Sequence, residues 1–210
     1  SAVVFKRLGQ FVQDTEELGY DSVWFAEHHF SNYGYITNPL IMSAHVAAQT
    51  SRIRIGTAVL VLPFWNPLRV AEDIALTDQL TGGRLEVGVA RGYQPFEYRR
   101  FGLEQADARE RTDEVLTILM RALTSDSFSF DGTYHHIPET TTFPKPVQQP
   151  CPPLWLAAHT QESFELAARH GLKAFTTNSG RPVSNLQEAW NNYTAARKQN
   201  RTRRRTSACR

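Results

Sequence analysis

Two adjacent histidines are the residues of this sequence best suited to carry out chemistry. His28 and His29 come directly after an apolar run at residues 24–26 and the carboxylate of Glu27. An imidazole changes its charge near neutral pH, so a histidine at the end of a strand can act as a general acid or base. A histidine pair in a loop is also commonly solvated or hydrogen-bonded for structural reasons. The residue types alone leave both interpretations open.

Metal binding is a second chemistry that histidines support. Four of them occur as two adjacent pairs, His28 with His29 and His135 with His136. Adjacent residues of an extended segment point to opposite faces, and the sequence has no His-x-x-x-His or Cys-x-x-Cys spacing. The two cysteines, Cys151 and Cys209, are far apart. We therefore expect no metal site.

An alternation of strands and helices positions the histidine pair. Short apolar runs predict strands at residues 21–26, 53–60, 84–89, 153–158 and 174–177. Helical periodicity, Asn-Pro starts and glycine stops predict helices at residues 5–18, 39–49, 67–81, 106–123, 161–170 and 184–198. Such strand-helix units in succession predict an α/β fold with a parallel sheet, either a barrel or a doubly wound sheet. No strand is followed by a Gly-x-Gly-x-x-Gly fingerprint, which favours the barrel.

The domain organisation follows from the same pattern. We expect one domain spanning residues 1–210, with a loop insertion at about residues 125–153 that contains a hairpin turning at Asp131-Gly132, and a basic tail at about residues 198–210. A (β/α)8 barrel has eight strands, of which about five are recognisable here. The sequence therefore predicts an incomplete barrel.

Composition excludes several classes of partner. The formal net charge is +2, and much of the basic excess lies in the last dozen residues, so the rest of the chain has no nucleic-acid footprint. No apolar run approaches the roughly 18 residues that span a bilayer, and no signal-peptide pattern is present. Two distant cysteines fit a reducing compartment. We expect a cytoplasmic protein that binds neither nucleic acid nor membranes.

Residues at the ends of other predicted strands suggest an anionic ligand. The C-terminal ends of parallel strands meet on one rim, which would bring Arg91 and Thr160 to the side of the sheet that carries the histidines. Thr160 begins a helix, whose N-terminal amides suit a phosphate, and Arg91 could bind the same phosphate with two hydrogen bonds. The alternative for Arg91 is a surface ion pair. The rim predicts an anionic cofactor.

An ordered series of segments resembles the bacterial luciferase-like flavin monooxygenases. The segments include residues 25–30 (Phe-Ala-Glu-His-His-Phe), 56–63 (Gly-Thr-Ala-Val-Leu-Val-Leu-Pro) and 88–92 (Gly-Val-Ala-Arg-Gly), in the order and spacing of that family. The resemblance implies a (β/α)8 TIM-barrel fold and the use of reduced FMN supplied by a separate flavin reductase. It also implies oxidation of an aldehyde or similar small organic substrate by molecular oxygen through a peroxyflavin.

The resemblance leaves alternatives of the same fold open. One is a deazaflavin-dependent oxidoreductase, and another is a non-catalytic flavin-binding or partner subunit. The family also implies a homodimer, for which the small-residue faces of the helices at residues 38–49 and 67–80 are the expected contact. The light-emitting subunits carry a cysteine at the position of Ala90 and a glutamate at that of His159, so light emission is not expected.

The resemblance also assigns roles to residues. His28 matches the catalytic histidine, and His29 matches its neighbour, whose role is less defined. Residues 57–59 match a bulge beneath the isoalloxazine, where related proteins have a non-proline cis peptide bond. Arg91 and its neighbour, together with residues 158–160, match the phosphate region. The predicted cofactor-binding residues are thus Thr57, Ala58, Val59, Arg91, Gly92, Ala158, His159 and Thr160.

Overall fold

The computed structural model describes residues 2–177 and 182–207, with side chains as far as residue 199. It consists of two compact units, Ser1–Pro152 and Pro153–Arg210, which are described separately. The expected single domain stays a prediction. Asn178 at the end of the predicted fifth strand, Cys209, and the side chains of most of the basic tail lie outside the described residues.

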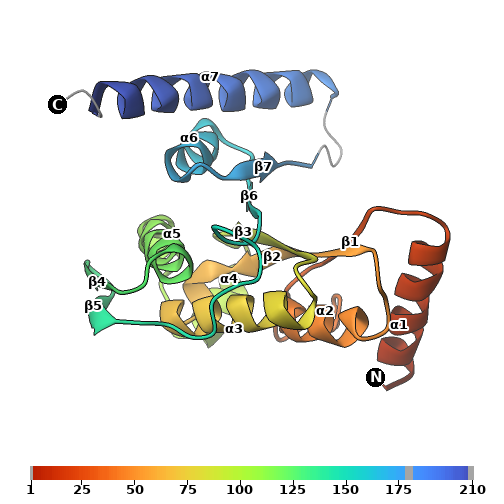
Figure 1. Ribbon diagram of the computed structural model, residues 1–210. Coiled ribbons are helices and arrows are strands. Elements are labelled where there is room, and N and C mark those ends of the chain that lie inside the picture. Colours follow the sequence, from red (N-terminus) through yellow and green to blue (C-terminus); the bar gives the residue numbers. More distant parts are fainter. Residues whose placement is uncertain (1, 178–181, 208–210) are drawn as a thin grey trace. The chain divides into compact units, whose positions relative to one another are not determined.

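Unit 1 alternates helices and strands and then adds a hairpin (Figure 1). Its elements are α1 (Ala2–Glu17), β1 (Ser22–Phe25), α2 (Pro39–Ala47), β2 (Arg54–Val61), a 3-10 turn (Leu62–Phe64), α3 (Pro67–Leu80), β3 (Leu85–Ala90), α4 (Pro95–Arg100), a second 3-10 turn (Gln105–Asp107), α5 (Ala108–Thr124), β4 (Phe128–Asp131) and β5 (His136–Thr140). The predicted strands and longer helices of this unit are all present, with ends shifted by a few residues.

Asparagine caps start the two helices that follow strands β1 and β2. Asn38 Oδ1 accepts hydrogen bonds from the backbone amides of Leu40 and Ile41 at 3.0 and 3.1 Å. Asn66 caps α3 in the same way, and a proline occupies the first turn of each helix. The caps satisfy amides that have no partner within the helix, which fixes where each helix leaves its loop.

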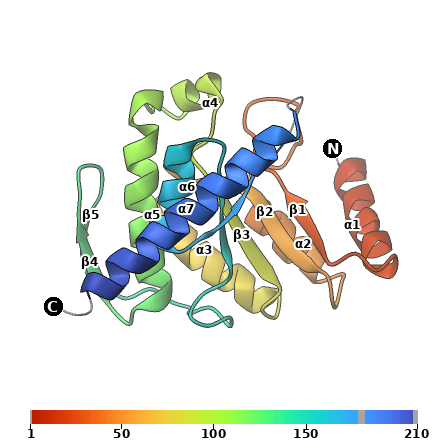
Figure 2. The same ribbon diagram turned by 90° about the horizontal axis from the view of Figure 1, so that it is seen from above.

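The sheet of unit 1 is parallel, with β2 between β1 and β3. Phe25 at the end of β1 is level with Thr57 of β2. The residues after Phe25 therefore lie beside the C-terminal part of β2. Helices α2 and α3 lie side by side against one face of this sheet (Figures 1 and 2).

A bulge interrupts the pairing of β2 with β3. The register shifts between Thr57 and Leu60, and the Ala58–Val59 peptide bond is cis. The Thr57 side chain links the two strands here, because its hydroxyl donates to the carbonyl of Gly88 at 2.8 Å and accepts from the amide of Gly88 at 2.9 Å. This buried hydroxyl therefore both donates and accepts a hydrogen bond, as buried polar groups generally do.

The apolar core of unit 1 lies between the sheet and its helices. Its buried aliphatic residues include Val46, Ile53, Ile55, Leu60, Val70, Ile74, Leu85, Val87, Leu116 and Leu119. Removal of these side chains from water is the main force that holds the strand ends in place. Three alanines of the expected dimer face, Ala47, Ala71 and Ala75, are buried within the chain itself. These three alanines are used in packing within the chain, whereas Ala44 is partly buried and Ala48 exposed, so the intermolecular contact through these helices stays a prediction.

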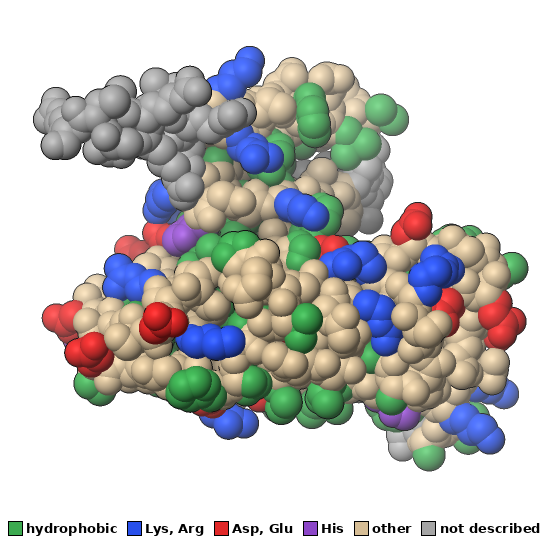
Figure 3. All heavy atoms as spheres, in the orientation of Figure 1, with side chains coloured by type: hydrophobic (Ala, Val, Ile, Leu, Met, Phe, Trp, Pro, Cys, Tyr) green, Lys and Arg blue, Asp and Glu red, His purple; other side chains and the backbone are tan. Residues whose placement is uncertain are grey.

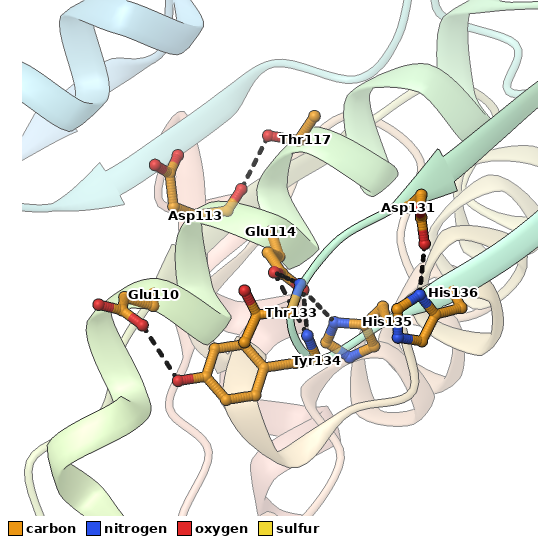
Figure 4. A network of polar contacts seen from close by, with 9 residues as sticks. All are labelled: Glu110, Asp113, Glu114, Thr117, Asp131, Thr133, Tyr134, His135 and His136. Carbon is orange, nitrogen blue, oxygen red and sulfur yellow. Dashed lines mark hydrogen bonds and ion pairs between the residues drawn. The ribbon is translucent and has the colours of Figure 1, made fainter.

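The hairpin β4–β5 is antiparallel and is tied to α5, as Figure 4 shows. The carboxylate of Glu114 on α5 accepts hydrogen bonds from the backbone amides of Thr133 and Tyr134 and lies 3.1 Å from Nδ1 of His135. One side chain thus holds the turn of the predicted insertion against the helix.

Unit 2 contains β6 (Leu154–Ala157), α6 (Gln161–His170), β7 (Lys173–Phe175) and α7 (Ser184–Ser207), with β6 and β7 parallel. Gly171 ends α6 with a φ of 74°, as the glycine stop predicted. Tyr193 of α7 donates its hydroxyl hydrogen to the carbonyl of Leu172 at 3.0 Å. This bond joins α7 to the end of α6.

Two elements differ from the sequence-based expectation. Helix α4 was not predicted, because six residues are too few to show a helical period. Helix α7 continues to Ser207, whereas the apolar pattern predicted an end near Lys198. Arginine, lysine and glutamine favour helix without any apolar face, so the loss of apolar residues did not mark the end.

Figure 3 shows that Lys and Arg side chains are interspersed with Asp and Glu on the visible face of unit 1. Such mixing gives this face no extended basic band of the kind that binds a nucleic-acid backbone. Among the described residues, no helix is long and apolar enough to cross a membrane.

Candidate active site

The histidine pair lies where β1 ends, beside the exit of β2. Strand β1 stops at Phe25, and the chain then turns away as a loop up to Asn38. The backbone amide of His28 donates to the carbonyl of Ile36 at 3.0 Å, which closes this loop at its base. His28 and His29 are thus fixed close to the sheet although they belong to a loop. Their side chains are only 13% and 14% exposed.

A buried carboxylate lies next to His29. Glu27 Oε1 is 2.8 Å from Nε2 of His29. Glu27 Oε2 accepts hydrogen bonds from the amide of Val61 and from the indole of Trp65, both at 3.0 Å. Glu27 therefore joins the end of β1 to the end of β2 and to the turn after it.

The charge of Glu27 responds to two opposing influences. Burial raises the pKa of its carboxyl group, while the hydrogen bonds from His29, Val61 and Trp65 lower it, and the net direction is upward. Glu27 is 3% exposed. The three donors around it offset part of the cost of removing a carboxylate from water.

A second buried carboxylate, Glu97, reaches the same segment from α4. Its Oε1 accepts the backbone amide hydrogen of His29 at 2.8 Å and lies 3.5 Å from Nδ1 of His28. Glu97 is 2% exposed. One oxygen atom therefore contacts both histidines, through the backbone of one and near the ring of the other.

The two imidazoles have different aromatic neighbours. The ring of His28 meets that of Tyr33 edge-on, with the ring centroids 4.6 Å apart, and its centroid is 6.3 Å from that of Tyr93. Both tyrosines are largely exposed. The ring of His29 packs edge-on against Phe101 at 4.9 Å and Phe64 at 5.9 Å. His28 therefore faces the exposed loops, and His29 faces the aromatic residues beside α4.

The predicted flavin bulge lies at the irregular part of β2. Thr57 is fully buried, and Ala58 and Val59 are partly buried at the shift in register. The cis bond expected from the family resemblance is present between Ala58 and Val59. This segment and the Glu27 loop are brought together by the parallel pairing of β1 with β2.

Arg91 and Gly92 follow β3 and complete this edge of unit 1. The Arg91 side chain is exposed, and within the described residues its guanidinium has no ion pair or hydrogen bond. Its backbone carbonyl accepts a hydrogen bond from the hydroxyl of Tyr98. Burial raises the pKa of Tyr98 to about 12, so this phenol stays a neutral donor. The surface ion pair considered for Arg91 is not found in the described part of the chain.

The backbone conformation and the packing at position 92 require a glycine. Its φ is 81°, in the left-handed region, and a Cβ on it would lie 2.6 Å from Cγ1 of Val61. The loop after β3 therefore passes directly against the end of β2.

The remaining predicted site residues belong to unit 2. Ala158 is buried, and its amide donates to the carbonyl of Phe175 at 2.9 Å. His159 Nδ1 lies 3.0 Å from the hydroxyl of Thr176. Thr160 caps α6 by accepting from the amide of Ser163, as predicted. These residues form the loop between β6 and α6 and are described within that unit alone.

Within the part of the chain that the structure describes, no group of three or more His, Cys, Asp or Glu side chains could hold a metal ion. At the histidine pair, Glu27 is in contact with the ring of His29, and Glu97 is in contact with the ring of His28.

Sequence reasoning missed the polar partners of the histidines. Glu27, Trp65 and Glu97 were not identified from the sequence as hydrogen-bond partners of the histidine segment. The carboxylate directly before a histidine pair was a usable signal for Glu27. Glu97 and Tyr98 gave no signal, because the short helix that carries them was not predicted.

Comparison with known proteins identifies relatives over most of the chain. A family model described as "Luciferase-like monooxygenase" matches residues 1–208. The oxygenase component of a flavin-dependent trigonelline monooxygenase from Acinetobacter baylyi is 34% identical over 83% of this chain and 49% of its own length. The alkanal monooxygenase alpha chain of the Kryptophanaron alfredi symbiont is 32% identical over 80% of this chain and 47% of its own.

Among solved structures, the monooxygenase RslO1 from Streptomyces bottropensis superposes with a TM-score of 0.89 at 30% identity, covering 93% of this chain and 60% of that one. The predicted fold class, α/β of the (β/α)8 TIM-barrel type with five recognisable parallel strands, is confirmed. The chain spans about half the length of the curated relatives it matches.

Proposed function

Because the chain belongs to the luciferase-like monooxygenase family, we propose that it acts as the oxygenase component of a two-component flavin-dependent monooxygenase. In this proposal a separate flavin reductase supplies reduced FMN, and molecular oxygen is used to oxidise a small organic substrate such as an aldehyde. Membership of the family and the flavin dependence named for the trigonelline relative support the reaction class.

The donor set at the end of β3 fits the phosphate of FMN. Arg91 extends an exposed guanidinium that has no partner among the described residues. Its backbone is held by Tyr98, and the glycine after it gives the chain its turn. A guanidinium binds a phosphate through two parallel hydrogen bonds, and a dinucleotide fingerprint is absent from the sequence. We therefore assign Arg91 to the cofactor phosphate and prefer FMN to FAD.

His28 is the residue that we assign to the chemistry. Its ring Nδ1 is close to the Glu97 carboxylate, which favours a proton on that nitrogen and leaves Nε2 as a hydrogen-bond acceptor. Reduced flavin, when bound, supplies the electrons that activate oxygen. His28 would accept or return a proton at Nε2, and its side chain is only 13% exposed to water.

The bulge at residues 57–59 supports the same assignment. We propose that Thr57, Ala58 and Val59 lie against the flavin ring and that Ala158, His159 and Thr160 contribute to its phosphate end. The small side chain of Ala58 lets a flat ring approach the backbone. The proposal includes a homodimer and a cytoplasmic location, both carried over from the family resemblance and composition.

The observation that carries the proposal is the combination of the family match with the position of His28 and Arg91 after β1 and β3, at the same end of the two parallel strands that flank β2. An anaerobic titration tests it. Reduced FMN, reduced FAD and a reduced deazaflavin are added to the protein, and binding is followed by the change in flavin absorbance and fluorescence. We expect the tightest binding for FMN. Tighter binding of FAD would contradict the cofactor assignment, and tighter binding of the deazaflavin would favour the alternative oxidoreductase.

A further inference from the structure

We propose that His29 is a positioning residue and not a catalytic one: Glu27 holds its ring in the tautomer with the proton on Nε2, Glu97 holds its backbone, and the two together place His28. The inference rests on the proposed function for the role of His28. It assigns different tasks to two histidines that are adjacent in the sequence and equally buried.

The ring of His29 has its Nε2 committed. Glu27 Oε1 lies 2.8 Å from this nitrogen. The other carboxylate oxygen of Glu27 already accepts from Val61 and Trp65. Because the hydrogen bonds from Val61 and Trp65 favour a carboxylate, which offers only acceptors, we assign the donor role to Nε2 of His29. This nitrogen is therefore not available to exchange a proton with a bound flavin.

The backbone of His29 is held independently of its ring. Its amide donates to Oε1 of Glu97 at 2.8 Å, and the preceding amide, that of His28, donates to Ile36 at 3.0 Å. Ring and backbone of His29 are thus attached to two carboxylates from different elements. His28 is placed by this arrangement because it is the residue between Glu27 and His29, and its own ring has no contact as short as these among the described residues.

The packing around His29 points the same way. Phe64 and Phe101 meet its ring edge-on and stack on each other at 4.7 Å. Such contacts resist rotation of the imidazole about its side-chain bonds. The aromatic neighbours of His28 among the described residues, by contrast, are the exposed Tyr33 and Tyr93. A side chain that contacts a ligand must be able to adjust its ring, as the more loosely packed His28 can. A side chain that positions its neighbour must keep its ring fixed, as the packed ring of His29 does.

The same unit contains a matched pair that serves as a control. Glu114 accepts hydrogen bonds from two backbone amides and lies beside the ring of His135 (Figure 4). Glu27 similarly accepts hydrogen bonds from one backbone amide and one indole and lies beside the ring of His29. The Glu114 pair fastens the β4–β5 hairpin to α5 and has no role in the proposed chemistry. Replacement of Glu114, which stabilises the fold, can therefore be compared with replacement of Glu27, which we propose positions a catalytic residue.

The first test is independent of activity. Nitrogen-15 NMR of protein labelled in the imidazoles, with His29→Gln used to assign its signals, reports which ring nitrogen carries the proton. We expect His29 to be protonated at Nε2 in the wild-type protein and to lose this preference in Glu27→Gln. A wild-type His29 protonated only at Nδ1 would overturn the inference, whether or not the protein oxidises flavin.

The second test compares replacements of His29 in a coupled oxidation assay. The amide of glutamine can donate to Glu27 from about the position of Nε2, so His29→Gln should keep the rate within about threefold of wild type, while His29→Ala should lose about ten- to a hundredfold through misplacement. The Kd for reduced FMN should change little in both. A rate in His29→Gln as low as that in His28→Gln would show that His29 takes part in proton transfer and would refute the inference.

Glu27→Gln and Glu114→Gln complete the comparison. Glu27→Gln should reduce kcat by about tenfold or more with little effect on flavin affinity, and Glu114→Gln should leave kcat unchanged while lowering the melting temperature. Equal kcat values for the two variants would contradict a positioning role for Glu27. If the wild-type protein bound reduced FMN and oxidised nothing, the proposed function would fail, and the NMR result would still decide the tautomer.

Discussion

Oxygen Oε1 of Glu97 lies 3.5 Å from Nδ1 of His28. The two residues come from α4 and from the loop after β1, which are far apart in the sequence and share no sheet pairing. Their proximity is therefore a product of packing, and it links the position of the proposed catalytic ring to a helix that periodicity alone does not predict.

Replacement of Glu97 should separate hydrogen bonding from charge. In Glu97→Gln the side-chain amide oxygen can still accept the His29 amide hydrogen, whereas Glu97→Leu leaves that amide without an acceptor. A buried donor without a partner costs about 1–3 kcal/mol. Denaturant unfolding should show a loss of that size for Glu97→Leu and a smaller one for Glu97→Gln. Equal losses would mean that the amide of His29 does not depend on this side chain.

Arg91→Ala should weaken FMN binding selectively. A hydrogen bond to a charged group contributes about 1.5–3 kcal/mol, which corresponds to roughly a ten- to a hundredfold rise in Kd. Riboflavin lacks the phosphate, so its Kd should not change. Arg99→Ala removes an exposed positive charge from α4 and is the matched control. If both flavins lost the same affinity in Arg91→Ala, the phosphate assignment would be wrong.

Gly92→Ala should destabilise the protein more than Gly102→Ala. Both glycines have positive φ, 81° and 69°, but only Gly92 has an atom of Val61 within 2.6 Å of the position of an added Cβ, while Gly102 has open space there. An alanine with positive φ lowers the free energy of unfolding by about 1–2 kcal/mol in both variants. The close contact with Val61 lowers it by about 1–3 kcal/mol more in Gly92→Ala. Thermal or urea unfolding of the two variants measures the difference. Identical losses would show that Val61 moves aside freely.

Glu16 should contribute to acid sensitivity. Burial raises the pKa of its carboxyl group. The hydrogen bonds from the backbone amides of residues 51–53 and the charge of Arg52 lower this pKa by more, so the net direction is down. A folded-state pKa below the unfolded value of about 4.3 contributes stability above that pH, and the contribution is lost as the pH falls through the folded-state value.

The test is the stability of Glu16→Gln against pH. The variant should be less stable than wild type at pH 7, and the gap should narrow as the pH falls below about 4.3. Glu17→Gln, on the exposed side of the same helix end, should leave the profile unchanged. A gap of constant size at all pH values would exclude an ionisation effect.

The sequence located the elements of unit 1 better than the contacts between them. The Asn-Pro helix starts at Asn38 and Asn66 and the strand end before His28 were predictable, because caps, prolines and apolar runs are local signals. The bulge at residues 57–59 was expected from the family resemblance. Residue type and position at strand ends named His28 and Arg91 as candidates, and the family resemblance then assigned their roles.

The partners of those candidates depend on the register of β1 with β2 and on the packing of a six-residue helix. Glu27 meets Trp65 only because the turn after β2 brings the indole back to the end of β1. Non-local contacts of this kind leave no period in the sequence, so the roles of Glu27 and Glu97 emerge only from the structure.

Reaction of bound reduced FMN with oxygen in a single turnover, with His28→Gln beside the wild-type protein, tests the central claim most directly. At flavin concentrations above the Kd of each protein, we expect oxidation of the organic substrate by wild type and a rate about 10²- to 10⁴-fold lower in His28→Gln, with the Kd of FMN nearly unchanged. Equal rates in the two proteins, with flavin bound to both, would contradict the assignment of His28 to the chemistry.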